Sequence, residues 1–427
     1  MQLLGRVRAS QFLRHNTVFF FGSVAVGALN YLYYPVLGRM LEPAAFGEVQ
    51  TLISLFLQLG IFLSVLSLVT VNIVANAEDD QQRNNLVLEF ERLALWVGVG
   101  LLVVTIVLQP TLKDFLHFTS AWPFALLAVA LVATIPFSLR SAFLRGKQRF
   151  GLVSGANITA SAAKLLGSVA LVAAGLGTAG AIGGLLLAQS LACALVVWWS
   201  LRLGLQKQQR RFRLPDIKLL LPELRYAALV LVASLVITVQ YSIDIIVIKH
   251  YFDAHTAGLY AGVASAARVI FFLTASIALV LMPAVKLRNT GRENYMLLVK
   301  SLALFALVSL PVLVIFIWFP RPVIGNLMGE SYTPMADLLP RLSLAIFVIS
   351  VLNLFVTYYL ALRKYVIAAV AILGGLITYA LMLANHGSPA AVVNGLLAGS
   401  CAMLGILALW MVGSKIKTAF AVNANKA

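Results

Sequence analysis

Long apolar segments separated by short polar turns dominate this sequence. A membrane-spanning helix needs about 20 predominantly apolar residues, and twelve stretches of about that length can be delimited. They lie at residues 16–38, 47–76, 93–110, 121–144, 151–176, 180–202, 225–249, 257–285, 297–319, 338–362, 365–385 and 389–413. The pattern predicts an all-α polytopic membrane protein with twelve transmembrane helices.

The second half of the chain repeats the pattern of the first. A shift of 211 residues aligns VLGRMLEPAAFGEV (36–49) with VIKHYFDAHTAGLY (247–260) without a gap and brings Gly47 to Gly258. Six helices in each half give both halves the same orientation, as in parallel-repeat transporters, whose substrate site lies between the repeats. We therefore expect two six-helix lobes around a central cavity. The N-terminal lobe takes residues 1–203, a basic cytoplasmic connector 204–224 and the C-terminal lobe 225–427.

The composition supports a membrane protein, since 61% of the residues are hydrophobic and only 11% are charged. The net charge of +17 raises the question of a nucleic-acid partner, because the run at residues 207–213 is strongly basic. Its position between the two halves instead indicates a topology determinant that contacts the lipid surface. We expect membrane lipids as partners and no nucleic acid.

The 32 Lys and Arg residues are distributed unequally over the two sides of the membrane. Lys164 and Arg268 lie inside apolar segments, and almost all the others fall on one side. The opposite side holds only Arg39, Lys113, Lys249, Arg321 and Arg341. Because basic residues accumulate in cytoplasmic loops, the sequence predicts a multi-pass protein of the cytoplasmic (inner) membrane with both termini in the cytoplasm.

The sequence shows no motif typical of an enzyme or a cofactor site. The outer loops are short, and neither an HExxH motif nor a Ser/His/Asp-like grouping occurs. GLGTAG at 175–180 fits a dinucleotide-binding pattern, but it joins two apolar helices, so we interpret it as an interhelical turn. Cys193 and Cys401 lie in apolar helices and indicate neither a disulfide nor a metal site. We expect no catalytic residue, cofactor or metal.

Lys164 is one of two cations in the middle of an apolar segment. An ionised side chain at bilayer depth costs about 2.5–3.5 kcal/mol on insertion scales and normally faces a polar interior. Asn157, Ser161 and Lys164 belong to a polar stripe on one helical face, which also includes Ser154 and Ser168. We expect this stripe to face a water-filled cavity. Snorkelling of Lys164 to the interface, or pairing with a buried acid, is the alternative.

Arg268 is the second deep cation, and two interpretations of it remain open. Its planar guanidinium suits a phosphate group, whereas Asp244 in the preceding apolar segment offers it a structural ion pair. Asp244, in turn, is a candidate for ion coupling or for charge pairing with Arg268.

Four further polar residues are candidates for weaker roles. Gln58 and Asn353 belong to secondary polar stripes whose amides suit hydrogen bonding to sugars, although polar residues also join packed membrane helices. Arg39 and Glu42 lie three residues apart near the outer end of the first helix. They are expected either to pair with each other or to form an outer gate.

The segments LGRMLEPAAFGEVQTLISLF (37–56) and YSIDIIVIKHYFDAHTAGLYAGVASAARV (241–269) resemble the starts of the two lobes in the polysaccharide transporter family. This family of lipid-linked oligosaccharide (O-antigen-type) flippases belongs to the multidrug/oligosaccharidyl-lipid/polysaccharide exporter superfamily. The resemblance implies a V-shaped, cationic cavity that receives the diphosphate of an undecaprenyl-linked glycan, at positions that map to Lys164 and Arg268. Peptidoglycan-precursor flippases carry arginines along the first helix that have no counterpart here before Arg39, which disfavours lipid II as cargo.

The resulting hypothesis is a flippase that moves a polyprenyl-diphosphate-linked oligosaccharide to the outer leaflet for surface polysaccharide biosynthesis. It would use rocker-switch alternating access and work as a monomer, and association with polysaccharide polymerase machinery is left open. The alternative is a multidrug and toxin extrusion-type cation antiporter, which shares the architecture but uses acids in its cavity. Two deep bases against one deep acid favour an anionic cargo.

Overall fold

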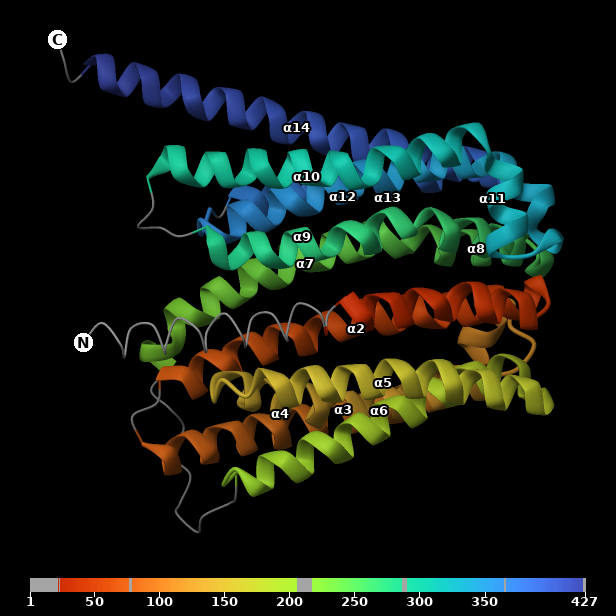
Figure 1. Cartoon of the computed structure of the whole chain (residues 1–427), viewed down its shortest axis with the longest axis horizontal. Helices are drawn as coiled ribbons and strands as arrows, with labels where there is room; N and C mark the ends of the chain where they lie inside the picture. Colours follow the sequence, from red (N-terminus) through yellow and green to blue (C-terminus); the bar gives the residue numbers. More distant parts are fainter. Residues whose placement is uncertain are drawn as a thin grey trace.

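The computed structural model describes residues 22, 24–76, 79–205, 217–285, 290–364 and 366–424, and within these ranges the chain is helical, with no strand (Figure 1). A leading helix covers residues 24–40. The helices that follow it are α2 (Pro43–Asn76), α3 (Asp80–Phe115), α4 (Trp122–Gly146), α5 (Phe150–Leu171), the π-helical turn η1 (Val172–Leu176) and α6 (Gly177–Arg202).

The second part of the chain adds eight α-helices and one short 3-10 helix. They are α7 (Ile217–Tyr251), α8 (Ala254–Ala267), α9 (Val269–Ala284), α10 (Gly291–Trp318), α11 (Pro320–Leu327), the 3-10 helix η2 (Glu330–Leu338), α12 (Leu339–Ala361), α13 (Val366–Ala384) and α14 (Pro389–Ala424). Helix α7 begins inside the segment expected to form the connector, because the apolar sequence IKLLL extends it towards its N-terminus. Residues 206–216 of that connector lie outside the described residues.

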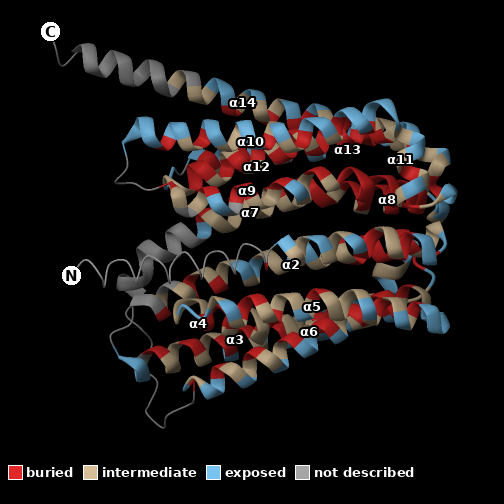
Figure 2. Ribbon diagram, viewed as in Figure 1, coloured by how far each residue is buried: buried red, intermediate tan, exposed pale blue. Residues whose placement is uncertain are grey.

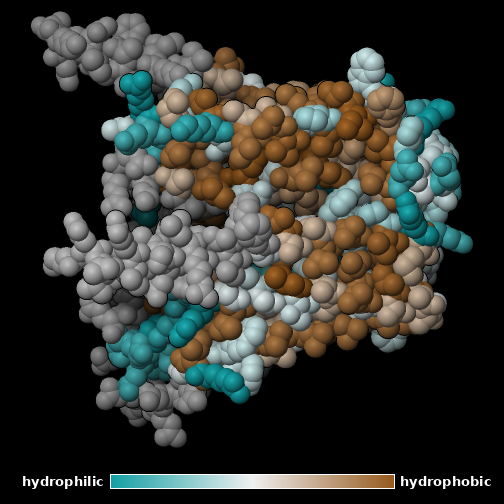
Figure 3. Space-filling view, viewed as in Figure 1, coloured by the Kyte–Doolittle hydropathy of each residue, from teal (hydrophilic) through white to brown (hydrophobic). Residues whose placement is uncertain are grey.

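Ten stretches of the described chain are long and apolar enough to cross a membrane. One of them, Phe150–Arg202, has 53 residues and contains both α5 and α6, while the leading helix is not among the ten. Apolar side chains cover the middle of the visible surface, and hydrophilic ones gather at its two ends (Figure 3). The chain is therefore an all-helical, multi-pass membrane protein, and the count of twelve spanning helices stays a prediction.

The helices form two packed groups. The N-terminal group contains α2–α6, in which α6 packs against α4 and α5, and α4 also packs against α2 and α3. The leading helix joins this group through hydrogen bonds to α5. The C-terminal group contains α7–α14, in which α12 packs against α9, α10 and α14, and α13 against α7 and α14. Buried residues are concentrated along α8 and α12 (Figure 2). Helix α2 joins the groups by packing against α7 and α8.

The two groups follow the 211-residue repeat in their helix boundaries. The start of α2 at Pro43 and of α8 at Ala254 differ by this shift, as do the starts of α3 at Asp80 and α10 at Gly291. Gly47 and Gly258, which the repeat aligns, also touch each other. A Cβ on Gly47 would lie 2.9 Å from the Gly258 Cα atom, so α2 and α8 cross with their backbones in contact. The division into lobes at residues 203 and 225 nevertheless stays a prediction.

Two ends of the bundle can be defined by these helix termini. The Gly47 end holds the starts of α2 and α8 together with α11 and η2, on the right in Figure 1. The opposite end, which we call the Lys147 end, holds the turn between α4 and α5 and the starts of α3 and α10. At the Gly47 end, α5 turns into α6 through Gly175 and Gly177, whose φ angles are +87° and +48°. A backbone of this kind suits glycine, which agrees with the interpretation of GLGTAG as a turn.

Candidate cation-lined cavity

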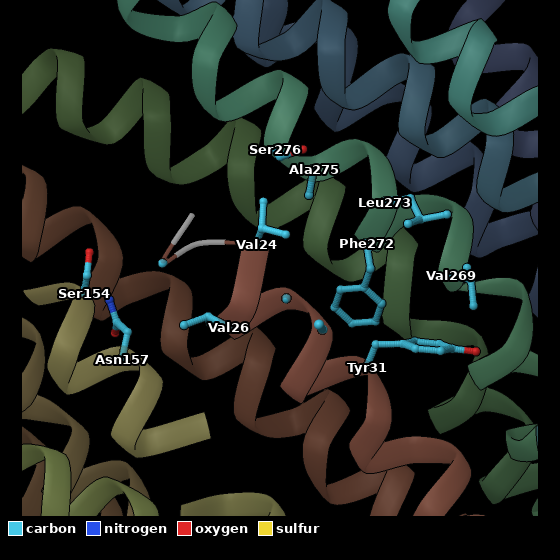
Figure 4. Close-up of a pocket in the computed structure, with 13 residues that line it drawn as sticks. Val24, Val26, Tyr31, Ser154, Asn157, Val269, Phe272, Leu273, Ala275 and Ser276 are labelled. Atoms are coloured by element: carbon cyan, nitrogen blue, oxygen red, sulfur yellow. The ribbon is translucent and has the colours of Figure 1, made fainter. Parts of the chain in front are cut away.

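Two adjoining cavities lie between the helix groups. The first, of about 420 Å³, is lined by the leading helix, α2, α5 and α6 on one side and by α7 and α9 on the other. The second, of about 630 Å³, lies mainly between the leading helix and α9, with Ser154 and Asn157 of α5 on its wall (Figure 4). Asn157 and Phe272 line both cavities. We call the first the lysine cavity and the second the apolar cavity.

Lys164 lines the lysine cavity and is half-buried. Its ammonium donates a hydrogen bond of 2.5 Å to the side-chain oxygen of Asn30 and lies 4.5 Å from the centre of the Tyr33 ring. Asn30 in turn donates to the Ser161 hydroxyl at 3.1 Å. Both partners of Lys164 are uncharged, and no acid lines either cavity among the described residues. The positive charge is therefore not neutralised by a neighbouring acid on the cavity wall.

The remaining members of the predicted stripe divide between the cavities and a helix interface. Ser161 lines the lysine cavity, Ser154 the apolar cavity and Asn157 both. Ser168 is fully buried and donates to the Ala181 carbonyl of α6 at 2.8 Å. The stripe thus follows the cavity wall for about three turns before it enters the packing between α5 and α6.

Arg268 forms the structural ion pair that the sequence left open. Its guanidinium lies 2.6 Å from one oxygen of Asp244 and also donates to the Tyr241 carbonyl at 3.0 and 3.1 Å. The other oxygen of Asp244 accepts a hydrogen bond of 2.6 Å from Tyr260. Arg268 is 5% exposed and Asp244 is fully buried, and neither lines the described cavities. Contact of Arg268 with substrate stays a prediction.

The two deep cations contact equivalent positions of the repeat. Lys164 contacts Asn30 and Tyr33 on the leading helix, whereas Arg268 contacts Tyr241 and Asp244 on α7. Residues 30 and 241, and likewise 33 and 244, are separated by the 211-residue shift. The cations themselves come from non-equivalent positions, since Lys164 lies in α5 and Arg268 joins α8 to α9. The repeat therefore brings one cation to the first helix of each group, but only the C-terminal group supplies an acid to neutralise it.

Gln58 and Asn353 lie outside the two described cavities. The Gln58 amide donates to the Ser242 hydroxyl of α7 at 3.1 Å, so it joins the two helix groups. Asn353 is half-buried in α12. Their predicted sugar contacts remain untested.

The predicted outer-gate residues lie at the Gly47 end. Arg39 donates to the backbone carbonyl of Asn326 in α11, across the boundary between the helix groups. Glu42 is exposed, and no ion pair links it to Arg39 in the described part of the chain. Arg39 therefore contacts the opposite group rather than its neighbour in sequence.

Several cavity residues were not singled out by the sequence pattern. Asn30 is a lone amide in the first apolar segment, a signal that could have identified it. Gln189 reaches the lysine cavity from α6, and its side-chain oxygen has no hydrogen-bond partner among the described residues. An aromatic cluster, here defined as Tyr31, Tyr33, Tyr34, Tyr241, Phe271 and Phe272, spans the two helix groups beside the lysine cavity. Aromatic residues are too frequent in membrane helices to mark such a cluster from sequence alone.

The helical architecture is shared with membrane transporters of known structure. An inward-facing multidrug resistance MATE family transporter of the MOP superfamily superposes with a TM-score of 0.73 at 15% identity, covering 93% of this chain and 99% of that one. Lipid II flippase MurJ, in an inward closed conformation, gives a TM-score of 0.69 at 12% identity, with coverages of 92% and 87%. An outward-facing MATE transporter gives 0.60 at 16% identity, with coverages of 93% and 94%.

The profile of the family described as "Polysaccharide biosynthesis protein" matches residues 36–337, which is well over half of the chain. The chain therefore belongs to this family of polysaccharide biosynthesis proteins. No curated protein sequence matches it. The resemblance stated from the sequence is confirmed at the level of the family and of the transporter fold.

Proposed function

We propose that this protein flips a polyprenyl-diphosphate-linked oligosaccharide from the cytoplasmic to the outer leaflet of the inner membrane. The observation that carries the proposal is Lys164, whose ammonium lines a cavity between the helix groups and has only uncharged partners. A cation held in this way is available to an anionic headgroup, and hydrogen bonds to a charged group are the stronger ones. Membership of the polysaccharide biosynthesis family supports a glycan as the rest of the cargo.

The two cavities suit the two chemical parts of such a substrate. The lysine cavity offers Lys164, Asn157, Ser161 and Gln189 to a diphosphate and the first sugars. The adjoining apolar cavity, between the leading helix and α9, offers mainly aliphatic and aromatic side chains to the polyprenyl tail (Figure 4). Because the cavities share lining residues, one molecule can extend through both. The tail would then leave towards the bilayer between the leading helix and α9.

We propose that the Gly47 end faces the outer side and the Lys147 end the cytoplasm. The excess of Lys and Arg predicted for the Lys147 end supports this orientation. The contact between Gly47 and Gly258 closes the bundle at the Gly47 end, which corresponds to an inward-facing state. The higher TM-score with the inward-facing than with the outward-facing transporter supports the same state. Export of an anion from a negative interior gains about 2.3 kcal/mol per charge per 100 mV.

In this state Arg268 positions Tyr241 on the cavity wall and does not contact the cargo. Its two hydrogen bonds to the Tyr241 carbonyl and its ion pair with Asp244 hold the α7 segment that lines the lysine cavity. Asp244 has both oxygens occupied, which fits charge pairing better than ion coupling. A role of Arg268 in substrate binding would require this ion pair to open during the cycle.

Flipping of a fluorescent polyprenyl-diphosphate oligosaccharide in proteoliposomes tests the proposal. The wild type should flip this lipid but not an otherwise identical glycolipid without the diphosphate. Lys164→Gln should slow flipping at least tenfold, whereas Lys113→Gln, at the far end of α3, should leave the rate unchanged. Export of organic cations without lipid flipping would contradict the proposal and favour the cation antiporter.

A further inference from the structure

Lys249, in the last turn of α7, is a buried cation that the proposed mechanism does not use. Its side chain is 1% exposed, and its ammonium lies 5.2 Å from the centre of the Phe118 ring. The ammonium has no hydrogen-bond partner in the part of the chain that the structure describes. An aromatic face compensates only part of the cost of burying a charge. Among the described residues, the protein therefore offers this ammonium an aromatic ring but no hydrogen-bond acceptor.

The surroundings of Lys249 belong to the opposite helix group. Residues His117, Phe118 and Thr119 connect α3 to α4, and a ring nitrogen of His117 lies 3.5 Å from the Lys249 carbonyl oxygen. Thr119 donates two hydrogen bonds, of 2.6 and 3.0 Å, to one oxygen of Glu48. The α7 cation thus inserts into the N-terminal group, and separation of the groups at the Gly47 end would expose it.

Glu48 does not neutralise Lys249 by direct contact. This α2 carboxylate is 1% exposed and accepts a third hydrogen bond, of 2.8 Å, from the Thr178 hydroxyl of α6. All three of its donors lie in its own helix group. No ion pair within 4.0 Å joins it to Lys249 among the described residues. The carboxylate is fixed on one group and the ammonium on the other.

We propose that Lys249 is a second binding site for a phosphate or diphosphate group, formed when the Gly47 end opens. This second site rests on the proposed function. Lys249 is then the cation that receives the headgroup after it leaves Lys164. In the closed state the unpaired ammonium is unfavourable, and in the open state it pairs with the anion. Lys249 therefore favours opening, whereas a residue that latches the two groups together would favour closure.

Inorganic pyrophosphate tests this site without the lipid. Spin labels are attached at Met40→Cys and His255→Cys, both exposed positions at the Gly47 end. Double electron–electron resonance then measures the distance between the labels, which increases when this end opens. Cys193 and Cys401 are replaced by serine, and Lys164→Gln removes the first anion site. Pyrophosphate should then increase the long-distance population at least twofold. Adding Lys249→Gln should abolish the increase, and adding Lys113→Gln instead should not.

The apolar variant Lys249→Met distinguishes an anion-binding role of Lys249 from a role in latching the two helix groups together. It removes the unpaired charge, so the inference predicts a larger closed population even without pyrophosphate. A larger open population in Lys249→Met, or an unchanged pyrophosphate response in Lys249→Gln, would overturn it. These distances do not depend on lipid transport, so a wild type that flips no lipid would refute the proposed function alone.

Discussion

The glycine contact between α2 and α8 can be tested by adding a single methyl group. Gly258→Ala would place a Cβ atom 2.7 Å from the backbone nitrogen of Ala44 and closer still to the Pro43 carbonyl oxygen. Ordinary contacts of this kind begin near 3.4 Å, so α8 must move away from α2 until the Pro43 carbonyl group clears the new methyl group. Backbone atoms cannot rotate out of the way, and the displacement therefore affects the packing of both helices.

Overpacking of this kind costs about 1–3 kcal/mol. Alanine in a helix interior also stabilises the folded protein by about 0.5–1 kcal/mol relative to glycine. The variant therefore needs a control in which glycine is likewise replaced by alanine. Gly60→Ala in α2 provides it, because a Cβ there would meet no atom within 4 Å. The difference in stability between the two variants thus isolates the overpacking cost.

Equilibrium unfolding in mixed micelles, with increasing fractions of SDS, measures that difference. Gly258→Ala should be less stable than Gly60→Ala by about 1–3 kcal/mol. Gly47→Ala should lie between them, because its Cβ would approach the Gly258 Cα atom only to 2.9 Å. Equal stabilities of Gly258→Ala and Gly60→Ala would show that α2 and α8 do not touch at this point.

Three further predictions concern buried and capping polar groups. Asp244→Asn leaves the Arg268 charge buried without its partner and should destabilise the protein by about 3–5 kcal/mol in the same unfolding assay; the double variant with Arg268→Gln should recover most of this loss. Asn30→Leu removes the hydrogen-bond acceptor of the cavity lysine and should slow lipid flipping severalfold without changing stability by more than about 1 kcal/mol; unchanged flipping would exclude a positioning role. Hydrogen bonds from Thr256, and then from the His255 backbone, lower the pKa of Asp253, so its N-cap stabilises α8 at neutral pH and is lost as the pH falls below about 4. Asp253→Ala should therefore cost about 1 kcal/mol at pH 7 and less at pH 3, whereas a cost that is independent of pH would contradict this cap.

The sequence predicted the helices better than the contacts between them. Apolar length alone located the segments, and the 211-residue repeat anticipated the matching starts of α2 and α8. Lys164 could be placed on a cavity wall because helical spacing collected Asn157 and Ser161 beside it. Apolar length and helical spacing are properties of a single segment, and the repeat is a comparison of the sequence with itself, so the sequence contains all three in full.

Contacts between distant helices depend on register and rotation, which the sequence pattern does not specify. Asn30 and Lys164 are hydrogen-bonded although they are 134 residues apart. The ion pair of Arg140 with Glu91, at 2.9 Å between α4 and α3, was not predicted for the same reason. For Arg268 the sequence named both a substrate and Asp244 as partners, and only the three-dimensional arrangement distinguishes them in this state.

In the proposed mechanism, Lys164 binds an anionic headgroup in the cavity between the helix groups. Native mass spectrometry with a short-chain polyprenyl diphosphate measures this binding apart from transport. A charge-assisted hydrogen bond contributes about 1.5–3 kcal/mol, so Lys164→Gln should weaken binding by about ten- to a hundredfold. Lys164→Arg keeps the charge and should retain binding within about threefold of the wild type. Equal affinity of the wild type and Lys164→Gln for the diphosphate would show that Lys164 does not bind the headgroup.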